Sequence, residues 1–334
     1  MMRISIIIPV YNSKDTLDLC LTAIFKSELK DYEVVVVDDA SGDVSVKIAQ
    51  KYPCRLIALK ENKGAAAVRN IGAGNANGDI LVFVDSDVVV YPAALNQLIC
   101  HLDDPGITGA VGMYSLKNRF GNFLSQYKHM VVCFRDLMTD DVNQDSFKAA
   151  FLAIRKEAFL SLPFDENIKR ASIEDIEFGR QLIKRGFRFI LDKNIQVEHV
   201  KRFGLKDYFR NQYQRSCDIA MNYLTQGSQK FYLTKTRKNS YAKAYILRAP
   251  LSVAFVFFVL LAVFLKAPLI LFGSVVVFIS SMMLEYRFLH FVLKERKIIF
   301  TLQCVLFYLV DGFISSLGIF RAGLKFCCFR RANV

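Results

Sequence analysis

The chain of 334 residues contains no tryptophan, only four histidines, and eight cysteines that form no Cys-x-x-Cys pair. These spacings exclude the usual structural zinc sites, and free thiols in a reducing compartment are the simplest interpretation of the cysteines. The adjacent Cys327 and Cys328 are either acylated or two small apolar residues at an interface. Internal repeats and low-complexity tracts are also absent from the sequence.

Two further absences concern partners and targeting. The net charge is +13, but no ladder of basic and aromatic residues accompanies it, and we expect no nucleic-acid partner. The amino-terminal apolar run, Ile4–Val10, is short for a signal peptide and ends in Tyr-Asn-Ser rather than in small residues. We therefore expect the amino-terminal domain to stay in the cytoplasm.

Hydrophobic residues make up 53% of the chain, and their distribution is uneven. Residues 1–240 have the composition of a globular domain, whereas residues 246–320 are mostly apolar. Basic residues gather beside the apolar segments, which favours the cytoplasmic face and contact with anionic membrane lipids. They are Lys235, Arg237, Lys238, Lys243, Arg248, Lys294, Arg296, Lys297, Arg321, Lys325, Arg330 and Arg331. The sequence thus predicts a membrane protein, in the inner or plasma membrane if the source is a bacterium.

We predict transmembrane helices at residues 246–265 and 268–284, which are about long enough to cross a bilayer as a hairpin. Residues 298–320 form a third apolar segment, which contains Asp311. A full crossing by this segment would place the basic residues after it outside the cytoplasm, against the positive-inside rule. The segment therefore either spans the membrane or lies at the interface, and we favour the interfacial arrangement.

The first part of the chain alternates between apolar runs and helical periods. We predict strands at residues 4–10, 33–38, 55–59, 80–85 and 108–113, with helices at 17–25, 43–51, 65–76 and 92–102. This alternation is typical of an α/β fold with right-handed crossovers and a parallel sheet. Beyond residue 113 we predict strands at 148–154, 188–191 and 195–199, and helices at 156–161, 174–185 and 205–224. Residues 120–138 are either a helix or an acceptor-side loop, and 205–224 lies either on the bilayer or on the core.

Two acidic pairs follow predicted strands. Asp38 and Asp39 end one strand, and the apolar run Leu81–Val84 leads directly into Asp85-Ser86-Asp87. Ligands of open α/β sheets bind beyond the carboxyl ends of the strands, so both pairs should meet in one crevice. Carboxylate oxygens there suit Mg²⁺ or Mn²⁺ carrying a diphosphate, although an Asp after a strand also occurs as simple turn chemistry.

Five segments, taken in order, resemble the family 2 inverting glycosyltransferases of GT-A fold over roughly residues 3–215. They are Ile4-Ser-Ile-Ile-Ile-Pro-Val-Tyr-Asn12, Val34-Val-Val-Val-Asp-Asp-Ala-Ser41, Asn62-Lys-Gly-Ala-Ala-Ala-Val-Arg-Asn70, Gly78-Asp-Ile-Leu-Val-Phe-Val-Asp-Ser-Asp87 and the run from Phe164 to Phe187. The resemblance implies a Rossmann-like, mostly parallel sheet with helices on both faces, followed here by membrane helices. It also implies a nucleotide-sugar donor and a divalent metal.

The resemblance assigns roles to individual residues. Pro9, Tyr11 and Asp39 would line the nucleoside pocket, Arg69 would approach the base or the phosphates, Asp85 would hold the ribose or assist the metal, and Asp87 would ligate Mg²⁺ or Mn²⁺ directly. A carboxylate at position 39 suits the N–H of a uracil ring, which favours a UDP-sugar. Arg69 has an alternative role as a surface arginine of its helix.

The remaining roles concern the reaction itself. Asp175 would be the general base, at a helix start where the dipole stabilises its anion. Glu174 beside it either contacts the substrates or is an ordinary first-turn charge. His199 would complete the metal shell or touch phosphate, or is structural. Arg210 and Arg215 would serve the phosphates from a closing segment.

The resemblance has limits that shape the predicted function. The Gln-x-x-Arg-Trp signature of processive synthases is lacking, and the continuation Val88–Pro92 differs from that of polyprenyl-phosphate sugar synthases. We therefore predict a membrane-bound, metal-dependent inverting glycosyltransferase that acts on a hydroxyl of a lipid-linked or membrane-presented acceptor. The alternatives are a polyprenyl-phosphate glycosyltransferase and a non-catalytic nucleotide-sugar-binding protein. Residues 1–230 would form the catalytic domain, 231–245 a basic linker and 246–334 the membrane region.

Overall fold

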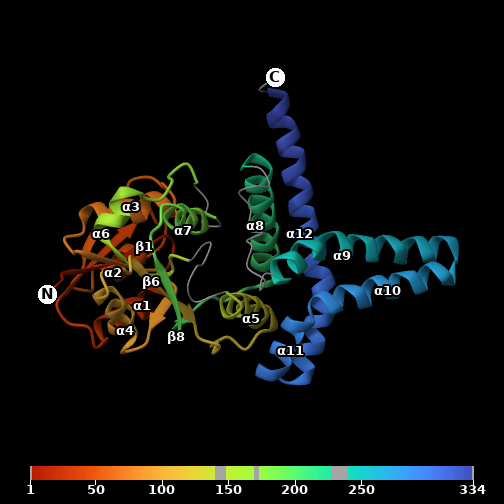
Figure 1. The fold of residues 1–334 in the computed structure, drawn as a ribbon, viewed down its shortest axis with the longest axis horizontal. Coiled ribbons are helices and arrows are strands. Elements are labelled where there is room, and N and C mark those ends of the chain that lie inside the picture. Colours follow the sequence, from red (N-terminus) through yellow and green to blue (C-terminus); the bar gives the residue numbers. More distant parts are fainter. Residues whose placement is uncertain (1, 140–147, 169–172, 227–239, 333–334) are drawn as a thin grey trace. The chain divides into compact units, whose positions relative to one another are not determined.

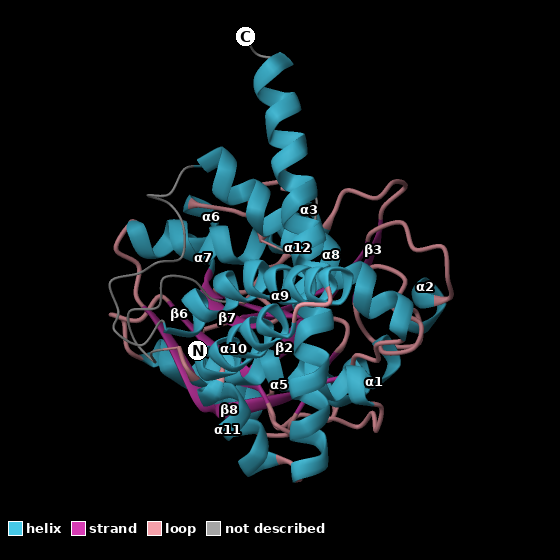
Figure 2. Cartoon of the chain, turned by 90° about the vertical axis from the view of Figure 1, so that its right-hand side faces the viewer, coloured by secondary structure: helices cyan, strands magenta, loops and turns pink. Residues whose placement is uncertain are grey.

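The computed structural model describes residues 2–139, 148–168, 173–226 and 240–332. Two compact units are distinguished by their internal contacts. The first comprises residues up to 120 together with 139–201, and the second comprises 121–138 together with 202–334. All the described strands belong to the first unit; Figure 2 shows strands in magenta and helices in cyan. The predicted catalytic domain, residues 1–230, is a functional division and stays a prediction.

The first unit is built on one mixed sheet of eight strands in the order β3-β2-β1-β4-β7-β6-β8-β5 (Figure 1). The strands are β1 Ile4–Val10, β2 Tyr32–Asp38, β3 Arg55–Ala58, β4 Ile80–Val84, β5 Val88–Val90, β6 Gly109–Tyr114, β7 Phe151–Arg155 and β8 Phe189–His199. Neighbours from β3 through β4 are parallel, as is the β6–β8 pair. The strand β7 runs antiparallel to both of its neighbours, β4 and β6.

The helices of the first unit connect these strands. They are α1 Leu17–Phe25, α2 Ser45–Ala49, α3 Ala65–Asn75, α4 Ala94–Cys100, α6 Lys156–Ser161 and α7 Glu174–Lys184, with a 3₁₀ turn at His101–Asp103. Ile7, Phe83 and Leu152 pack with side chains of α3, α6 and α7 on one face of the sheet. Ile6 and Val82, which point to the opposite face, are also fully buried. Both faces of the sheet are therefore covered, as in other parallel α/β sheets.

The structure confirms most predicted elements and corrects two. Of the two alternatives given for residues 120–138, a helix or a loop, the structure shows the helix, α5 Phe123–Leu137. The two strands predicted at 188–191 and 195–199 are one strand, β8. The short strand β5 was not predicted, because Val88–Val90 follows the Asp-x-Asp turn directly and pairs with β8, about 100 residues later in the chain.

The second unit is helical. Besides α5 it contains α8 Leu205–Gln226, α9 Ser240–Leu265, α10 Pro268–Leu284, α11 Tyr286–Glu295 and α12 Ile298–Ala332. The helices α9 and α10 pack side by side as a hairpin (Figure 1). The core of the second unit is an aromatic cluster around Tyr127, Tyr208 and Phe288. Beside this cluster, Asp311 of α12 accepts hydrogen bonds from Tyr208 Oη and pairs with the buried Arg248 of α9.

Two helices are individually long and apolar enough to cross a membrane, at Leu247–Leu265 and Ile298–Cys328. The first agrees with the predicted span 246–265. The predicted span 268–284 is α10, which reaches the required length only together with α11, across a bend of 65°. The third predicted segment, 298–320, is the first part of the long helix α12. The basic residues Lys235, Arg237 and Lys238 of the predicted linker lie outside the described residues.

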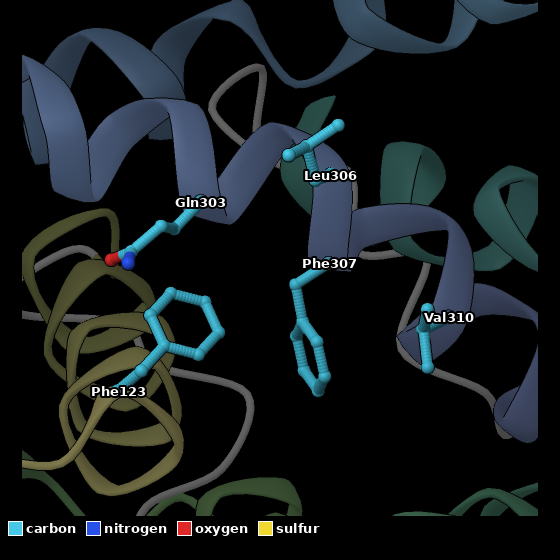
Figure 3. A pocket seen from close by; sticks show the side chains of 5 residues that line it. All are labelled: Phe123, Gln303, Leu306, Phe307 and Val310. Atoms are coloured by element: carbon cyan, nitrogen blue, oxygen red, sulfur yellow. The ribbon is translucent and has the colours of Figure 1, made fainter.

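The second unit also contains an apolar groove of about 370 Å³ on α5 and α12 (Figure 3). It is lined by Phe123, Gln303, Leu306, Phe307 and Val310. Gln303 contributes the polar side chain of this lining, and no charged group belongs to it. The groove therefore lacks the cations that a sugar diphosphate would require.

Candidate active site

The loops after β1 and β2 are joined by hydrogen bonds at the carboxyl edge of the sheet. The backbone N–H of Asn12 donates to Ser41 Oγ at 2.9 Å, and the N–H of Gly42 donates back to Asn12 Oδ1 at 2.9 Å. Asn12 has a positive φ of 50°, a conformation that asparagine tolerates better than most residues. The neighbouring Tyr11 is 53% exposed at this edge. Pro9, near the end of β1, is half-buried.

Asp39 lies buried directly after β2, as predicted from the strand pattern. Its Oδ1 accepts the backbone N–H of Lys63 at 2.6 Å and its Oδ2 accepts that of Gly64 at 2.9 Å. Gly64, with a φ of +89°, precedes the first residue of α3 and needs the freedom of glycine there. The carboxylate thus holds the start of α3, and each oxygen retains a second lone pair for a ligand N–H.

Arg69 of α3 joins two of the acidic motifs. Its Nη2 donates to Asp85 Oδ1 at 2.8 Å, and its Nη1 donates to Glu174 Oε1 at 3.0 Å. The side chains of Arg69 and Glu174 are only 5% and 4% exposed, and the guanidinium lies 5.4 Å from the centre of the Phe164 ring. The structure buries Arg69, so the alternative of a surface arginine is wrong, whereas its approach to the base or the phosphates stays a prediction. Arg69 brings the end of β4 and the start of α7 together.

The start of α7 carries two acidic residues with different surroundings. Burial and the neighbouring charge of Asp175 raise the pKa of Glu174 and Arg69 lowers it, so that the net pKa is about 7. The second oxygen of Glu174, Oε2, has no hydrogen-bond partner among the described residues. Asp175 is half-buried, and its Oδ1 accepts the N–H of Ile176 at 2.8 Å. The first turn of the helix thus orients the carboxylate predicted to be the base.

Asp87 lies beside a histidine and a lysine. Its Oδ2 lies 3.5 Å from His199 Nε2 and 3.3 Å from Lys201 Nζ. The backbone holds these residues together, since β5 and β8 pair Val88 with His199 and the N–H of Val200 donates to the Asp87 carbonyl at 2.8 Å. The His199 ring stacks on Tyr114, with centroids 4.3 Å apart. Burial raises the pKa of Asp87, but Lys201 and His199 lower it more, so the net pKa is well below its ordinary value.

The donor set at Asp87 fits a divalent metal that shares its ligands with a substrate. Among the described residues, no three side chains of His, Cys, Asp or Glu converge as a metal site would require. Mg²⁺ and Mn²⁺ bound with nucleotide substrates commonly use one or two protein ligands, with diphosphate and water oxygens supplying the rest. A carboxylate oxygen and an imidazole nitrogen 3.5 Å apart match that arrangement.

The structure also places two other predicted residues, and two residues that the sequence analysis did not identify. Arg210 and Arg215 lie on α8 in the second unit, and their role at the phosphates stays a prediction. The sequence analysis did not identify Lys201. Side chains two residues apart in an extended chain point to the same side, and Lys201 stands two residues after His199. Ser86 was also missed; its Oγ lies 2.8 Å from Ser13 Oγ and connects the Asp-x-Asp turn to the loop after β1.

The chain is similar in sequence to known proteins. The model of the family described as "Glycosyl transferase family 2" matches residues 5–162. The succinoglycan biosynthesis protein ExoO of Rhizobium meliloti is 33% identical over 208 residues, which are 61% of this chain and 53% of ExoO. An uncharacterized glycosyltransferase of Haemophilus influenzae is 24% identical over 277 residues, 73% of this chain and 93% of that protein. The chain thus spans about half the length of ExoO.

Among solved structures, a mannosyltransferase from Pyrobaculum calidifontis, PcManGT, in complex with GDP-Man and Mn²⁺, has a similar fold. Its TM-score is 0.59 at 18% identity, and the match covers 95% of this chain and 87% of the other. At this identity the similarity concerns the fold alone. It confirms the predicted GT-A architecture.

Proposed function

Because the chain belongs to glycosyl transferase family 2, we propose that it is a membrane-bound, metal-dependent inverting glycosyltransferase. It would move a sugar from a nucleotide-sugar, with UDP-sugars favoured, to a hydroxyl of an acceptor at the membrane. The observation that carries the proposal is the bridge from Asp85 through Arg69 to Glu174, at 2.8 and 3.0 Å. This bridge brings the Asp-x-Asp motif and the acidic start of α7 to one site.

The donor would lie along the carboxyl edge of β1, β2 and β4. The exposed Tyr11 ring and the buried Asp39 are placed to receive the nucleoside, since one offers a flat apolar surface and the other a hydrogen-bond acceptor. Asp87 and His199 are placed to hold Mg²⁺ or Mn²⁺ together with the diphosphate. When bound, the metal would neutralise the charge of the departing nucleoside diphosphate.

The reaction itself requires a base on the acceptor side. Asp175 would take the proton from the acceptor hydroxyl as that oxygen attacks the anomeric carbon, which inverts its configuration. Its carboxylate is held by the first turn of α7 and is only half-buried, so an acceptor can reach it. Arg69 and Glu174 would position this helix relative to Asp85, and Arg69 would also approach the base or the phosphates of the donor.

The acceptor is inferred from the rest of the chain. Two helices of the second unit are long and apolar enough to cross a membrane. One relative acts in succinoglycan biosynthesis, which supports an acceptor in the assembly of a polysaccharide or glycolipid. We propose a lipid-linked saccharide or glycolipid, with the catalytic domain on the cytoplasmic side.

Calorimetry on the detergent-purified full chain tests the donor. UDP-, GDP- and TDP-sugars are titrated with and without Mn²⁺, and the expected result is Mn²⁺-dependent binding of one donor. Asp87→Ala is expected to abolish the Mn²⁺ dependence, whereas the matched variant Asp79→Ala, at the opposite edge of the sheet, keeps it. Absence of binding by every donor would reject the proposal. If a polyprenyl-phosphate sugar is extracted as the product, the acceptor is a phosphate and not a hydroxyl.

A further inference from the structure

The long helix α12 carries an exposed apolar stripe along one face. Large apolar side chains recur there every three or four residues, which is the spacing of a single helix face, over about 38 Å of helix. The exposed members of this stripe are Ile299, Leu302, Leu306, Val310, Phe313, Leu317, Phe320 and Leu324. Leu306 and Val310 also line the apolar groove, so the groove and the stripe form one continuous apolar surface.

Within the second unit, α12 runs across the hairpin of α9 and α10 and not alongside it (Figure 1, Figure 2). Arg248, near the start of the apolar part of α9, pairs with Asp311 in the middle of α12. Ser316 Oγ donates to the carbonyl of Ala249 at 2.8 Å, and Gly312 allows the close approach, because a Cβ atom there would collide with a side chain of α9. If the hairpin crosses a bilayer, α12 therefore lies close to the plane of the membrane.

A polar helix, α8, accompanies the second half of α12. Tyr208 Oη donates to Asp311 of α12. Further along both helices, Gln212 Nε2 donates to Ser315 Oγ at 2.9 Å, so α8 and this half of α12 run side by side. The exposed polar residues of α8 along this stretch are Lys206, Asp207, Arg210 and Gln214. Charged side chains are costly in the hydrocarbon core of a membrane, so α8 and the part of α12 beside it should stay at its surface.

The remaining part of α12 is too short to cross alone. Residues 298–310 extend over about 20 Å, whereas the hydrocarbon core is about 30 Å thick. The whole helix is long and apolar enough to cross by length and composition. Its neighbour α8 and its direction relative to the hairpin favour the other arrangement, in which the helix lies flat.

We propose that α12 lies in the plane of the membrane, with its apolar stripe toward the hydrocarbon and its basic residues against anionic lipid headgroups. The inference rests on the proposed function, because it takes the hairpin as a membrane anchor, and it adds a lipid-binding surface. Exposed basic residues stand near both ends of the helix, at Lys294, Lys297, Arg321 and Lys325. Arg321 and Lys325 each directly follow a residue of the stripe, where their stems can cover apolar surface while their charges reach lipid phosphates.

Tryptophan fluorescence tests this arrangement without background, because the chain contains no tryptophan. Leu302→Trp, Phe313→Trp and Phe320→Trp each replace an exposed apolar residue, near the start, in the middle and near the end of the stripe. Each full-length variant is reconstituted in vesicles of phosphatidylcholine and phosphatidylglycerol. The acyl chains of the phosphatidylcholine carry bromine, which quenches tryptophan, at a shallow, a middle or a deep position. We expect the shallow bromines to quench all three variants most strongly.

A helix that crosses the membrane gives a different pattern. Phe313→Trp would then be quenched most by the deep bromines and the other two variants by the shallow ones, because about 10–16 Å of helix separates the positions. That pattern would overturn the inference, as would the absence of quenching at all three positions.

Phe257→Trp separates this inference from the proposed function. Phe257 is exposed near the middle of the apolar part of α9, and the deep bromines should quench its replacement most strongly. Deep quenching there, combined with a depth that varies along α12, would overturn the inference alone. Absence of deep quenching at this position would instead reject the membrane anchor of the proposed function.

The headgroup contact is tested in the Phe320→Trp protein. Brominated phosphatidylglycerol should quench it at least about two-fold more strongly than the same fraction of brominated phosphatidylcholine, because the basic residues concentrate anionic lipid. Adding Arg321→Gln and Lys325→Gln should abolish this preference. Lys266→Gln, which removes an exposed cation at the turn of the hairpin, is the matched control and should retain it. Equal quenching by both lipids before the basic residues are removed would overturn the proposed contact with anionic headgroups.

Discussion

Glu174 offers a direct test of the buried bridge at the start of α7. We consider Glu174→Gln, which keeps the shape of the side chain and an oxygen to accept from Arg69, but cannot carry a charge. Burial is the main reason that the pKa of Glu174 is raised from its ordinary value of 4.5 to about 7. The substitution therefore removes the proton equilibrium and leaves Arg69 paired with Asp85 at 2.8 Å.

The sign of the effect follows from proton binding. Between pH 4.5 and 7 the folded protein holds more protons at Glu174 than the unfolded chain, so its free energy of unfolding falls as the pH rises. The stabilisation is complete below about pH 4.5 and is lost as the pH passes through 7. A shift from 4.5 to about 7 corresponds to about 3 kcal/mol. Glu174→Gln lacks this loss and should gain that amount relative to wild type between pH 4.5 and 8.

Thermal unfolding of both proteins in detergent, at one scan rate and at pH 5, 6, 7 and 8, measures the difference. For a unit of this size, 3 kcal/mol corresponds to a shift of roughly 6–12 °C in the midpoint. Other groups titrate equally in both proteins and cancel in the comparison. Glu157→Gln, which changes an exposed carboxylate of α6, is the matched control and should show no such trend. A difference between wild type and Glu174→Gln that stays constant with pH, or falls, would refute the reasoning.

Three further substitutions test the separate roles of the site. Asp175→Asn should lower kcat by about 10²- to 10⁴-fold with the donor affinity nearly unchanged, because a general base contributes that much; equal loss of donor binding in calorimetry would contradict this role. Asp87→Ala should weaken donor binding in Mn²⁺ by at least about 10-fold and remove the difference between titrations with and without Mn²⁺. Arg69→Met should lower the free energy of unfolding by about 3–5 kcal/mol, because it leaves Glu174 and Asp85 without their buried partner. Adding Glu174→Gln should recover part of that loss in thermal unfolding, and a double variant no more stable than Arg69→Met would argue against the pairing.

The parallel half of the sheet and its acidic edge were predictable from local sequence. Strands β1, β2 and β4 are mostly apolar runs with helices between them, and polar residues stand at or directly after their carboxyl ends, which the crossover rule places at one edge. The positions of Asp39, Asp85 and Asp87 follow from that rule together with the family resemblance. The direction of β7 did not follow, since an apolar run of five residues carries no information about which strand it pairs with.

The roles of charged residues were less predictable, because they depend on burial and on partners far away in the chain. Arg69 looks like a ligand-binding residue in its motif, yet its two partners, Asp85 and Glu174, are 16 and 105 residues away and bury its guanidinium. The meeting of Lys201 with Asp87 depends on the pairing of β5 with β8, which joins residues more than 100 positions apart. Propensity and periodicity describe neighbours along the chain and give no information about pairs that are distant in sequence.

The position of β7 in the sheet has a consequence for how the chain folds during synthesis. All five residues of β4 are buried, but one edge of this strand is completed only by β7, which begins at Phe151, about 70 residues after β4 ends. At usual rates of translation this is a delay of about 4–14 s, much longer than the time in which strands pair. During that delay an apolar strand with a free edge is open to pairing with other nascent chains. The strand order therefore makes the speed of translation between residues 85 and 155 a determinant of how much of the protein folds without aggregating.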